Sequence, residues 1–95
     1  MKGYVVCVYK SINSEEKLKE YALKARVAVE KHKGKFLIRG GKSKINEGEK
    51  SPRTVVIEFQ SFDKANAFYQ SKDYQEAHSI LEGFAERQFQ IVEGV

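Results

Sequence analysis

The sequence contains few of the side chains on which cross-linking, metal binding and nucleophilic catalysis usually depend. It has one cysteine, one proline, one methionine, no tryptophan and two histidines in 95 residues. Because Cys7 stands alone, no disulfide can form within the chain, as expected for a protein of a reducing compartment. His32 and His78 are 46 residues apart, and neither has a cysteine or carboxylate at metal-ligand spacing. We therefore predict no metal site, no haem and no other cofactor.

Long apolar runs and glycine-rich phosphate motifs are also missing. The apolar run YVVCVY, residues 4–9, is too short for a signal peptide or a membrane span. The cysteine within it has apolar neighbours, so we expect a buried thiol rather than a nucleophile. No P-loop and no GxGxxG motif occurs. These absences predict a soluble cytoplasmic protein that does not associate with membranes.

The charge that is present is modestly basic. The 17 lysines and arginines exceed the 13 acidic residues, which gives a net charge of +4, and 41% of the residues are hydrophobic. This composition is typical of a packed globule, and the length suits one domain spanning residues 1–95. The positive balance fits an anionic ligand or simply solubility, and it favours nucleic acid only weakly.

The order of the predicted elements indicates the fold. Residues 3–10 form a strand, and residues 14–33 form a helix with Asn13 or Ser14 as its N-cap and Gly34 as a left-handed terminator. The later elements are a strand at 35–39, a bend at Gly40 and Gly41 with a continuation at 42–46, a strand at 53–60, helices capped by Ser61 and Ser71, and a strand at 87–93. This order predicts an α+β fold, namely a ferredoxin-like βαββαβ two-layer sandwich with an antiparallel sheet.

In such a fold both helices cover one face of the sheet, so the residues of the other face need an explanation. The first strand is apolar at both alternating sets of positions, which is typical of a strand covered on both sides. Phe36 and Ile38 are expected on one face of their strand. The opposite face would carry a mixed set: Leu37, Arg39, Val56, Glu58 and Gln90. Because a large apolar face is unusual on a monomer, we predict a homodimer that closes sheet against sheet, a dimeric α/β-barrel.

The strands around the hairpin hold the first candidate site residues. A polar group enclosed between two sheets needs a partner. In such a space Glu58 could serve as a proton acceptor or as an anchor for a ligand, and Arg39 could hold an anion. Alternatively, these two pair with each other or with the partner subunit and are purely structural. The backbone at Gly40 and Gly41 beside an arginine fits a carboxylate or phosphate site, and Arg53 is a further candidate for the anion.

The segment between the last two predicted helices holds the remaining candidates. Tyr69 and Tyr74 flank a turn and could close over an aromatic or planar ligand, or they are ordinary packing residues. His78 lies one helical turn after Tyr74 and could either transfer protons near neutral pH or pack half-buried. The set of expected catalytic residues is therefore Glu58 and His78, and no metal ligand is among the candidates.

RNA binding is an alternative because RNA-recognition modules share the βαββαβ order. Those modules carry a basic residue, a glycine and stacking aromatic residues on the third strand. The corresponding strand here, RTVVIEF at 53–59, has no glycine, and Glu58 would repel phosphate. RNA binding is the least favoured alternative, and we predict no nucleic-acid partner.

Several motifs along nearly the whole chain suggest a relationship. They are Arg39-Gly40-Gly41, Glu47-Gly48, Arg53, Glu58-Phe59, Tyr69 with Ser71, Tyr74, and the closing Val92-Glu93-Gly94. Together they resemble the small bacterial family known as domain of unknown function 1330, within the dimeric α/β-barrel superfamily. The resemblance implies a ferredoxin-like protomer and a dimer closed by the two sheets.

That superfamily includes haem-degrading and quinone-forming monooxygenases, lactone isomerases and binding modules, so the resemblance implies no single reaction. Their pockets lie between sheet and helices or at the dimer seam. Two positions depart from the family pattern, because Lys72 stands where proline is common and Leu81 where arginine is frequent. If that arginine binds an anion in relatives, this chain has one contact fewer.

Two functions follow from these patterns. In the first, the protein is a homodimer that binds a small organic acid, anionic or aromatic, near the sheet and the dimer seam, with acid/base chemistry as an option. In the second, it is a structural dimer module whose polar seam residues serve no small-molecule chemistry. A ligand-filled pocket at Glu58 would favour the first.

Overall fold

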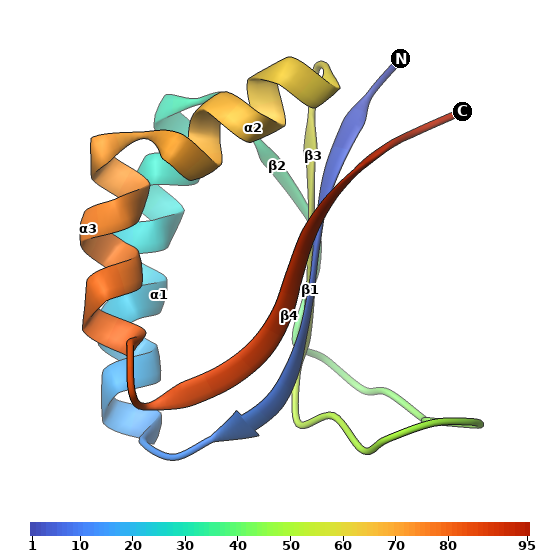
Figure 1. Ribbon diagram of the computed structural model, residues 1–95, viewed down its shortest axis with the longest axis vertical. Helices are drawn as coiled ribbons and strands as arrows, with labels where there is room; N and C mark the ends of the chain where they lie inside the picture. The colour runs from blue at the N-terminus through green and yellow to red at the C-terminus, as the bar shows by residue number, and fades with distance from the viewer.

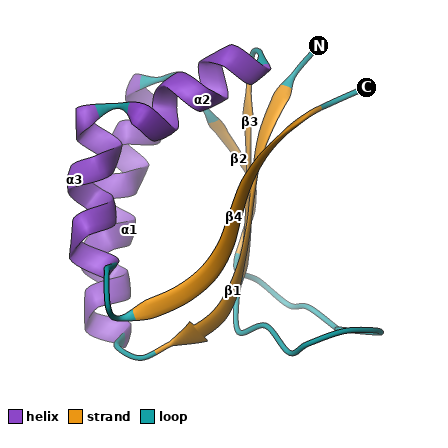
Figure 2. Ribbon diagram, viewed as in Figure 1, coloured by secondary structure: helices purple, strands orange, loops and turns teal.

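The computed structural model describes residues 1–95 and contains four strands and three helices (Figure 1). In chain order they are β1 (Gly3–Ile12), α1 (Glu15–Lys31), β2 (Lys35–Arg39), β3 (Thr54–Phe59), α2 (Phe62–Gln70), α3 (Lys72–Leu81) and β4 (Ala85–Glu93). The strands form one antiparallel sheet in the order β2-β3-β1-β4. Figure 2 shows all three helices on the same face of this sheet. The predicted ferredoxin-like order is confirmed, with α3 as the short helix expected after Ser71.

Serine caps define where the helices begin. The side chains of Ser14, Ser61 and Ser71 each accept a hydrogen bond from the backbone N–H three residues later, at 3.1 Å. Each cap satisfies a donor that the first helical turn leaves without a partner. The three predicted N-caps are confirmed, with Ser14 rather than Asn13 capping α1.

The end of α1 differs from the prediction. Lys33, not Gly34, adopts the left-handed conformation, with φ of 61°. Gly34 is required for a different reason, since a Cβ there would lie 2.7 Å from the Phe59 ring and 2.8 Å from Val29. The prediction that Gly34 is the left-handed terminator was wrong, because the glycine provides close packing of the helix end against β3 instead.

The core lies between the sheet and the helices. Val5, Cys7 and Tyr9 of β1 point toward the helices and are at most 2% exposed. Phe68 of α2 and Tyr74 of α3 face them and are at most 1% exposed, with their rings 4.8 Å apart between centroids. The prediction of a buried thiol at Cys7 is confirmed.

The hairpin is shorter and more irregular than predicted. Residues 42–46 do not continue β2, and no strand occurs between Arg39 and Thr54. The chain leaves the sheet through Gly40 and Gly41, which both have positive φ, 72° and 87°. Figure 1 shows this connecting segment projecting away from the helices, on the uncovered side of the sheet.

A β-bulge in β2 changes which residues share a face. Phe36 pairs with Ile57, but Ile38 then pairs with Val56 and Arg39 with Val55. Between Phe36 and Ile38 the chain of β2 has one residue more than the paired segment of β3, which shifts the alternation of side chains between the two faces. Arg39 therefore lies on the helix side and Ile38 on the uncovered side. The expected faces of Ile38 and Arg39 were therefore wrong, since strict alternation does not hold across the bulge.

The uncovered face of the sheet carries apolar side chains without cover from this chain. Tyr4, Val6 and Val8 of β1 are half-buried there, and Val56 of β3 lies beside Val6. Ile38 and Val92, at the two edge strands, are 46% and 42% exposed. None of the three helices is long and apolar enough to span a bilayer.

Candidate functional site

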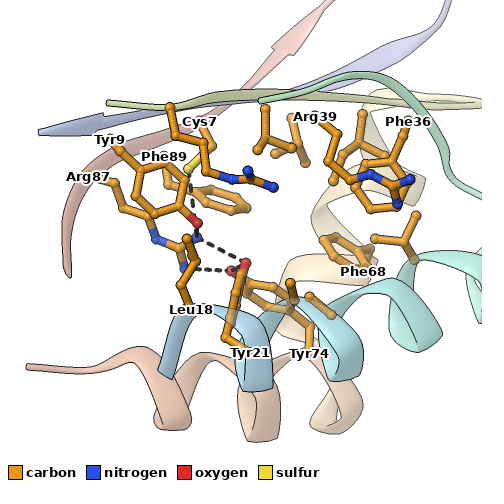
Figure 3. Close-up of a pocket in the computed structure, with 17 residues that line it drawn as sticks. Cys7, Tyr9, Leu18, Tyr21, Phe36, Arg39, Phe68, Tyr74, Arg87 and Phe89 are labelled. Atoms are coloured by element: carbon orange, nitrogen blue, oxygen red, sulfur yellow. Dashed lines mark hydrogen bonds between the residues drawn. The ribbon is translucent and has the colours of Figure 1, made fainter. Parts of the chain in front are cut away.

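A cavity lies between the helix-facing side of the sheet and helices α1 and α3 (Figure 3). The space free of atoms is about 490 Å³ when the open mouth of the cavity is included. The centre of a water molecule can occupy about 40 Å³ of it. Most of its lining is apolar, and the exceptions are three arginines, Arg39, Arg53 and Arg87. This is a small apolar cavity with an unusual excess of positive charge.

Arg87 of β4 is held by tyrosine hydroxyls rather than by a carboxylate. Its Nη1 donates to Tyr21 at 2.9 Å and to Tyr9 at 3.1 Å, and its Nη2 donates to Tyr74 at 2.8 Å. The Tyr21 and Tyr74 hydroxyls lie 2.9 Å apart and share one further hydrogen bond. Three elements, β1, α1 and α3, thus converge on one guanidinium (Figure 3).

These hydroxyls do not neutralise Arg87. Burial raises the pKa of Tyr9 to about 12 and also raises the pKa of Tyr74. Burial likewise raises the pKa of the Cys7 thiol, whose Sγ is 3.7 Å from Arg87 Nη1. At neutral pH Cys7, Tyr9 and Tyr74 are therefore uncharged, and the guanidinium keeps its full positive charge.

Arg53 is fixed by its backbone immediately before β3. Its carbonyl accepts from the Tyr9 N–H at 2.9 Å and from the Ser51 hydroxyl at 2.9 Å. Its side chain enters the cavity, where Nε is buried and has no hydrogen-bond partner. A Cβ at Gly40 would lie 2.7 Å from Arg53 Nη1, so the glycine leaves room for the guanidinium.

Arg39 is the third cation of the cavity and is exposed at its edge. Its guanidinium carbon lies 4.5 Å from the centroid of the Phe36 ring, within the range of a cation–π contact. The bulge in β2 directs it to this side of the sheet. An exposed arginine on an aromatic ring is pre-positioned to meet a ligand that enters the cavity.

No carboxylate balances these three cations. The ion pairs of the chain are Lys17–Glu20, Arg26–Glu30 and Lys31–Asp73, and none of them involves a cavity arginine. No acidic residue lines the cavity either. An unneutralised cation in apolar surroundings is costly, so the cavity is electrostatically complementary to an anion.

The structure brings together four of the residues predicted for the site. Arg39, Arg53 and Tyr74 line the cavity, and Gly40 adjoins the Arg53 guanidinium. Gly41 continues the bend beside them, with open space around its Cα. The sequence predicted an anion site that combines arginines with the paired glycines, and the structure brings these residues together at the cavity.

The other predicted residues lie elsewhere. Glu58 pairs with Tyr4 in the sheet register and accepts a hydrogen bond from the Tyr4 hydroxyl at 3.2 Å, on the uncovered face. His78 lines a second hollow at the end of α3 with Lys10 and Glu86, and this hollow shares Arg87 with the cavity. Tyr69 packs its ring against Tyr74 and supports the cavity wall from outside. The expectation that Glu58 and Arg39 share a face is contradicted by the register.

Sequence reasoning missed Arg87, Tyr9 and Tyr21. The sequence did indicate a special position for Arg87. It lies two residues before Phe89 and four before Ile91 in β4, so its side chain faces the helices as theirs do. A charged residue at a core-facing position of a strand marks either a structural ion pair or a binding site. The tyrosines gave no such signal, since aromatic residues are ordinary in a core.

The Tyr9 hydroxyl should ionise late in an alkaline titration. Its folded-state pKa of about 12 is above the ordinary value of 10.0, so the protonated hydroxyl favours the folded state. This contribution to stability is complete below pH 10 and is lost as the pH rises toward 12. We expect phenolate absorbance of the folded protein to show a component near pH 12 that is absent in Tyr9→Phe. Ionisation of every tyrosine near the ordinary value would contradict the hydroxyl cluster.

The fold and the arginine-lined cavity together define a ferredoxin-like protein with a cationic pocket between its two layers. The model of one family matches residues 2–95. The chain belongs to this family, which is described as Domain of unknown function (DUF1330). No match is found among curated proteins.

Solved structures share the fold at low sequence identity. A protein of unknown function from Rhodopseudomonas palustris gives a TM-score of 0.77 at 12% identity, with 99% of this chain and 82% of that chain covered. A candidate antibiotic biosynthesis monooxygenase from Caulobacter crescentus CB15 gives 0.65 at 11% identity, with 99% and 89% covered. A dimeric protein of unknown function with a ferredoxin-like fold from Bacteroides fragilis NCTC 9343 gives 0.60 at 19% identity, with 98% and 96% covered. These similarities confirm the ferredoxin-like fold.

Proposed function

We propose that this protein binds a small organic anion in the cavity between the sheet and the helices. The observation that carries the proposal is the convergence of Arg39, Arg53 and Arg87 on one apolar cavity without a carboxylate. A bound carboxylate would satisfy Arg53 Nε and neutralise positive charge in apolar surroundings, where charge-assisted hydrogen bonds are strong. The apolar lining would contact an aromatic or aliphatic body.

The proposal is one of binding rather than of proton transfer. No carboxylate and no imidazole lines the cavity, because Glu58 and His78 both lie outside it. Among the titratable groups that do line it, Cys7, Tyr9 and Tyr74 have pKa values raised by burial and stay protonated at neutral pH. A general base needs a pKa near the working pH, which these groups lack.

The same proposal includes a homodimer closed by the uncovered face of the sheet. The half-buried Tyr4, Val6 and Val8 form an apolar strip through the centre of this face, with Val56 beside it. A second copy related by a two-fold axis would cover this strip with its own. The hydrogen-bonded pair of Tyr4 and Glu58 would then lie in the seam as a satisfied polar contact.

A ligand screen tests the site and its location. Thermal denaturation would be followed with aliphatic and aromatic carboxylates, and at least one acid is expected to raise the melting temperature. In Arg39→Met the affinity should fall by about five- to tenfold, because one partly screened charge contact is lost. In Glu58→Gln the stabilisation should persist, since Glu58 lies on the other face.

Two outcomes would contradict the proposal. If no acid stabilises the wild type, the arginines are structural and the protein is better described as a dimer module without a ligand. If stabilisation is lost in Glu58→Gln and retained in Arg39→Met, the ligand binds on the uncovered face instead. Arg26→Met serves as a matched control, because Arg26 is exposed on α1 and pairs with Glu30 outside the cavity.

A further inference from the structure

We propose that the ligand of this cavity is a dicarboxylate that spans it, with one acid group at each of two cationic ends. This inference deepens the proposed function and rests on it. It follows from the number of unneutralised charges, from the hydrogen-bond donors that remain without an acceptor, and from their separation into two groups across an apolar centre.

The number of cations without a carboxylate partner favours a ligand with more than one negative charge. Arg53 and Arg87 are both half-buried, and neither has a carboxylate partner. The groups that contact Arg87 are three tyrosine hydroxyls and a thiol, and none of them is a carboxylate. A monoanion would leave at least one of the two half-buried cations unneutralised, whereas a dianion neutralises both.

The hydroxyl hydrogens around Arg87 form the first group of free donors. Tyr9, Tyr21 and Tyr74 all accept from the guanidinium, so their own hydrogens must point elsewhere. One hydrogen is used between Tyr21 and Tyr74. The hydrogen of Tyr9 and the remaining hydrogen of that pair have no acceptor in the structure. A carboxylate, which only accepts, can take both.

The second group of donors is at Arg39 and Arg53. The Arg53 guanidinium extends toward Gly40, the chain neighbour of Arg39, from a position where its charge also acts on the Cys7 thiol. Arg53 Nε is buried there without an acceptor. Figure 3 shows Arg39 and Arg87 on opposite sides of the cavity, both facing inward from the sheet.

Between these ends the lining is apolar. Val55 and Ile57 of β3 lie on the sheet side and Phe68 on the helix side. A ligand that places acid groups at both ends must therefore carry a hydrocarbon body between them. This arrangement distinguishes a dicarboxylate from a compact dianion such as inorganic phosphate, which can reach only one end.

Matched pairs of acids test the inference. Calorimetric titration of the wild-type protein at neutral pH would compare succinate, glutarate and adipate with butyrate, pentanoate and hexanoate, and terephthalate with benzoate. The best diacid should bind at least about tenfold more tightly than the monoacid with the same skeleton, because a second acid group meets a second cation. Inorganic phosphate is titrated as the compact dianion.

Variants show whether the preference comes from the proposed ends. The ratio of diacid to monoacid affinity should fall toward one in Arg39→Met and in Arg53→Met. It should stay unchanged in Arg26→Met, whose arginine lies outside the cavity. Arg39 is exposed, so its variant is expected to fold even if the Arg53 variant does not.

The outcomes separate this inference from the proposed function. Monoacids that bind as tightly as diacids, with affinity that depends on Arg39, would overturn the dicarboxylate and leave anion binding intact. Phosphate that binds more tightly than every diacid would overturn the two-ended ligand. A complete lack of binding by all these acids would overturn the proposed function together with the inference.

Discussion

Replacement of Arg53 by methionine is expected to stabilise the ligand-free protein and to weaken ligand binding. The buried Nε has no hydrogen-bond partner, and the guanidinium has no carboxylate, so the wild type carries an uncompensated cation in an apolar cavity. Removal of an unsatisfied buried polar group is worth about 1–3 kcal/mol. In a domain of this size each kcal/mol corresponds to roughly 4–8 °C in Tm.

Binding should change in the opposite direction. Loss of one partner from a hydrogen-bonded charge pair costs about 2 kcal/mol or more, so the affinity for the best acid should fall by at least about thirtyfold. Chemical denaturation of the ligand-free variant and calorimetric titration with that acid provide the two measurements. Opposite signs of the two effects are typical of a binding residue that is retained at a cost in stability.

Arg26→Met is the matched control for this variant. It removes an exposed arginine from α1 and should change neither the affinity nor, beyond a few tenths of a kcal/mol, the free energy of unfolding. If Arg53→Met instead lowers the stability of the ligand-free protein by a similar amount to other core substitutions, Arg53 holds the fold together and the anion site is refuted.

Introduction of glutamate at Val6 should convert the proposed dimer into monomers. Val6 lies in β1, one of the two central strands, and faces the uncovered side between Tyr4 and Val8. A two-fold interface would place this carboxylate in an apolar seam together with its copy from the other subunit, and like charges in an interface cost several kcal/mol. The dissociation constant of the dimer should therefore rise by about a hundredfold or more.

Sedimentation equilibrium checks this prediction, with the wild type at twice the chain mass of 10.9 kDa and the variant at the chain mass. Val27→Glu is the matched control, because Val27 is 64% exposed on α1 and lies on the helix layer. A wild type that sediments at 10.9 kDa at high concentration would refute the dimer. Dissociation by Val27→Glu would place the interface on the helices.

Local patterns in the sequence were sufficient to predict most elements of the fold. The caps at Ser14, Ser61 and Ser71 depend only on the residue and the three that follow it, and strand alternation depends only on neighbours. The bulge in β2 was not predictable in this way, because it results from pairing with β3, a contact between segments far apart in the chain. The same long-range effect caused the error in the face assigned to Arg39.

The candidate site was partly predictable for a similar reason. Arg39, Gly40 and Arg53 were singled out as an anion site because arginine beside flexible backbone suits anions, and the structure places them around one cavity. Arg87 and Tyr21 come from β4 and α1, and only the folded arrangement of these elements shows that they meet. The functional roles of all these residues stay predictions until ligands are measured.

The bulge in β2 also has a consequence for how family members should be compared. A relative with an arginine aligned to Arg39 but without the extra residue would direct that side chain toward the opposite surface of its sheet. Ligand preference in such a relative would differ although the aligned residue is identical. Backbone length in this strand, as well as side-chain identity, therefore determines whether the mouth of the pocket carries a positive charge.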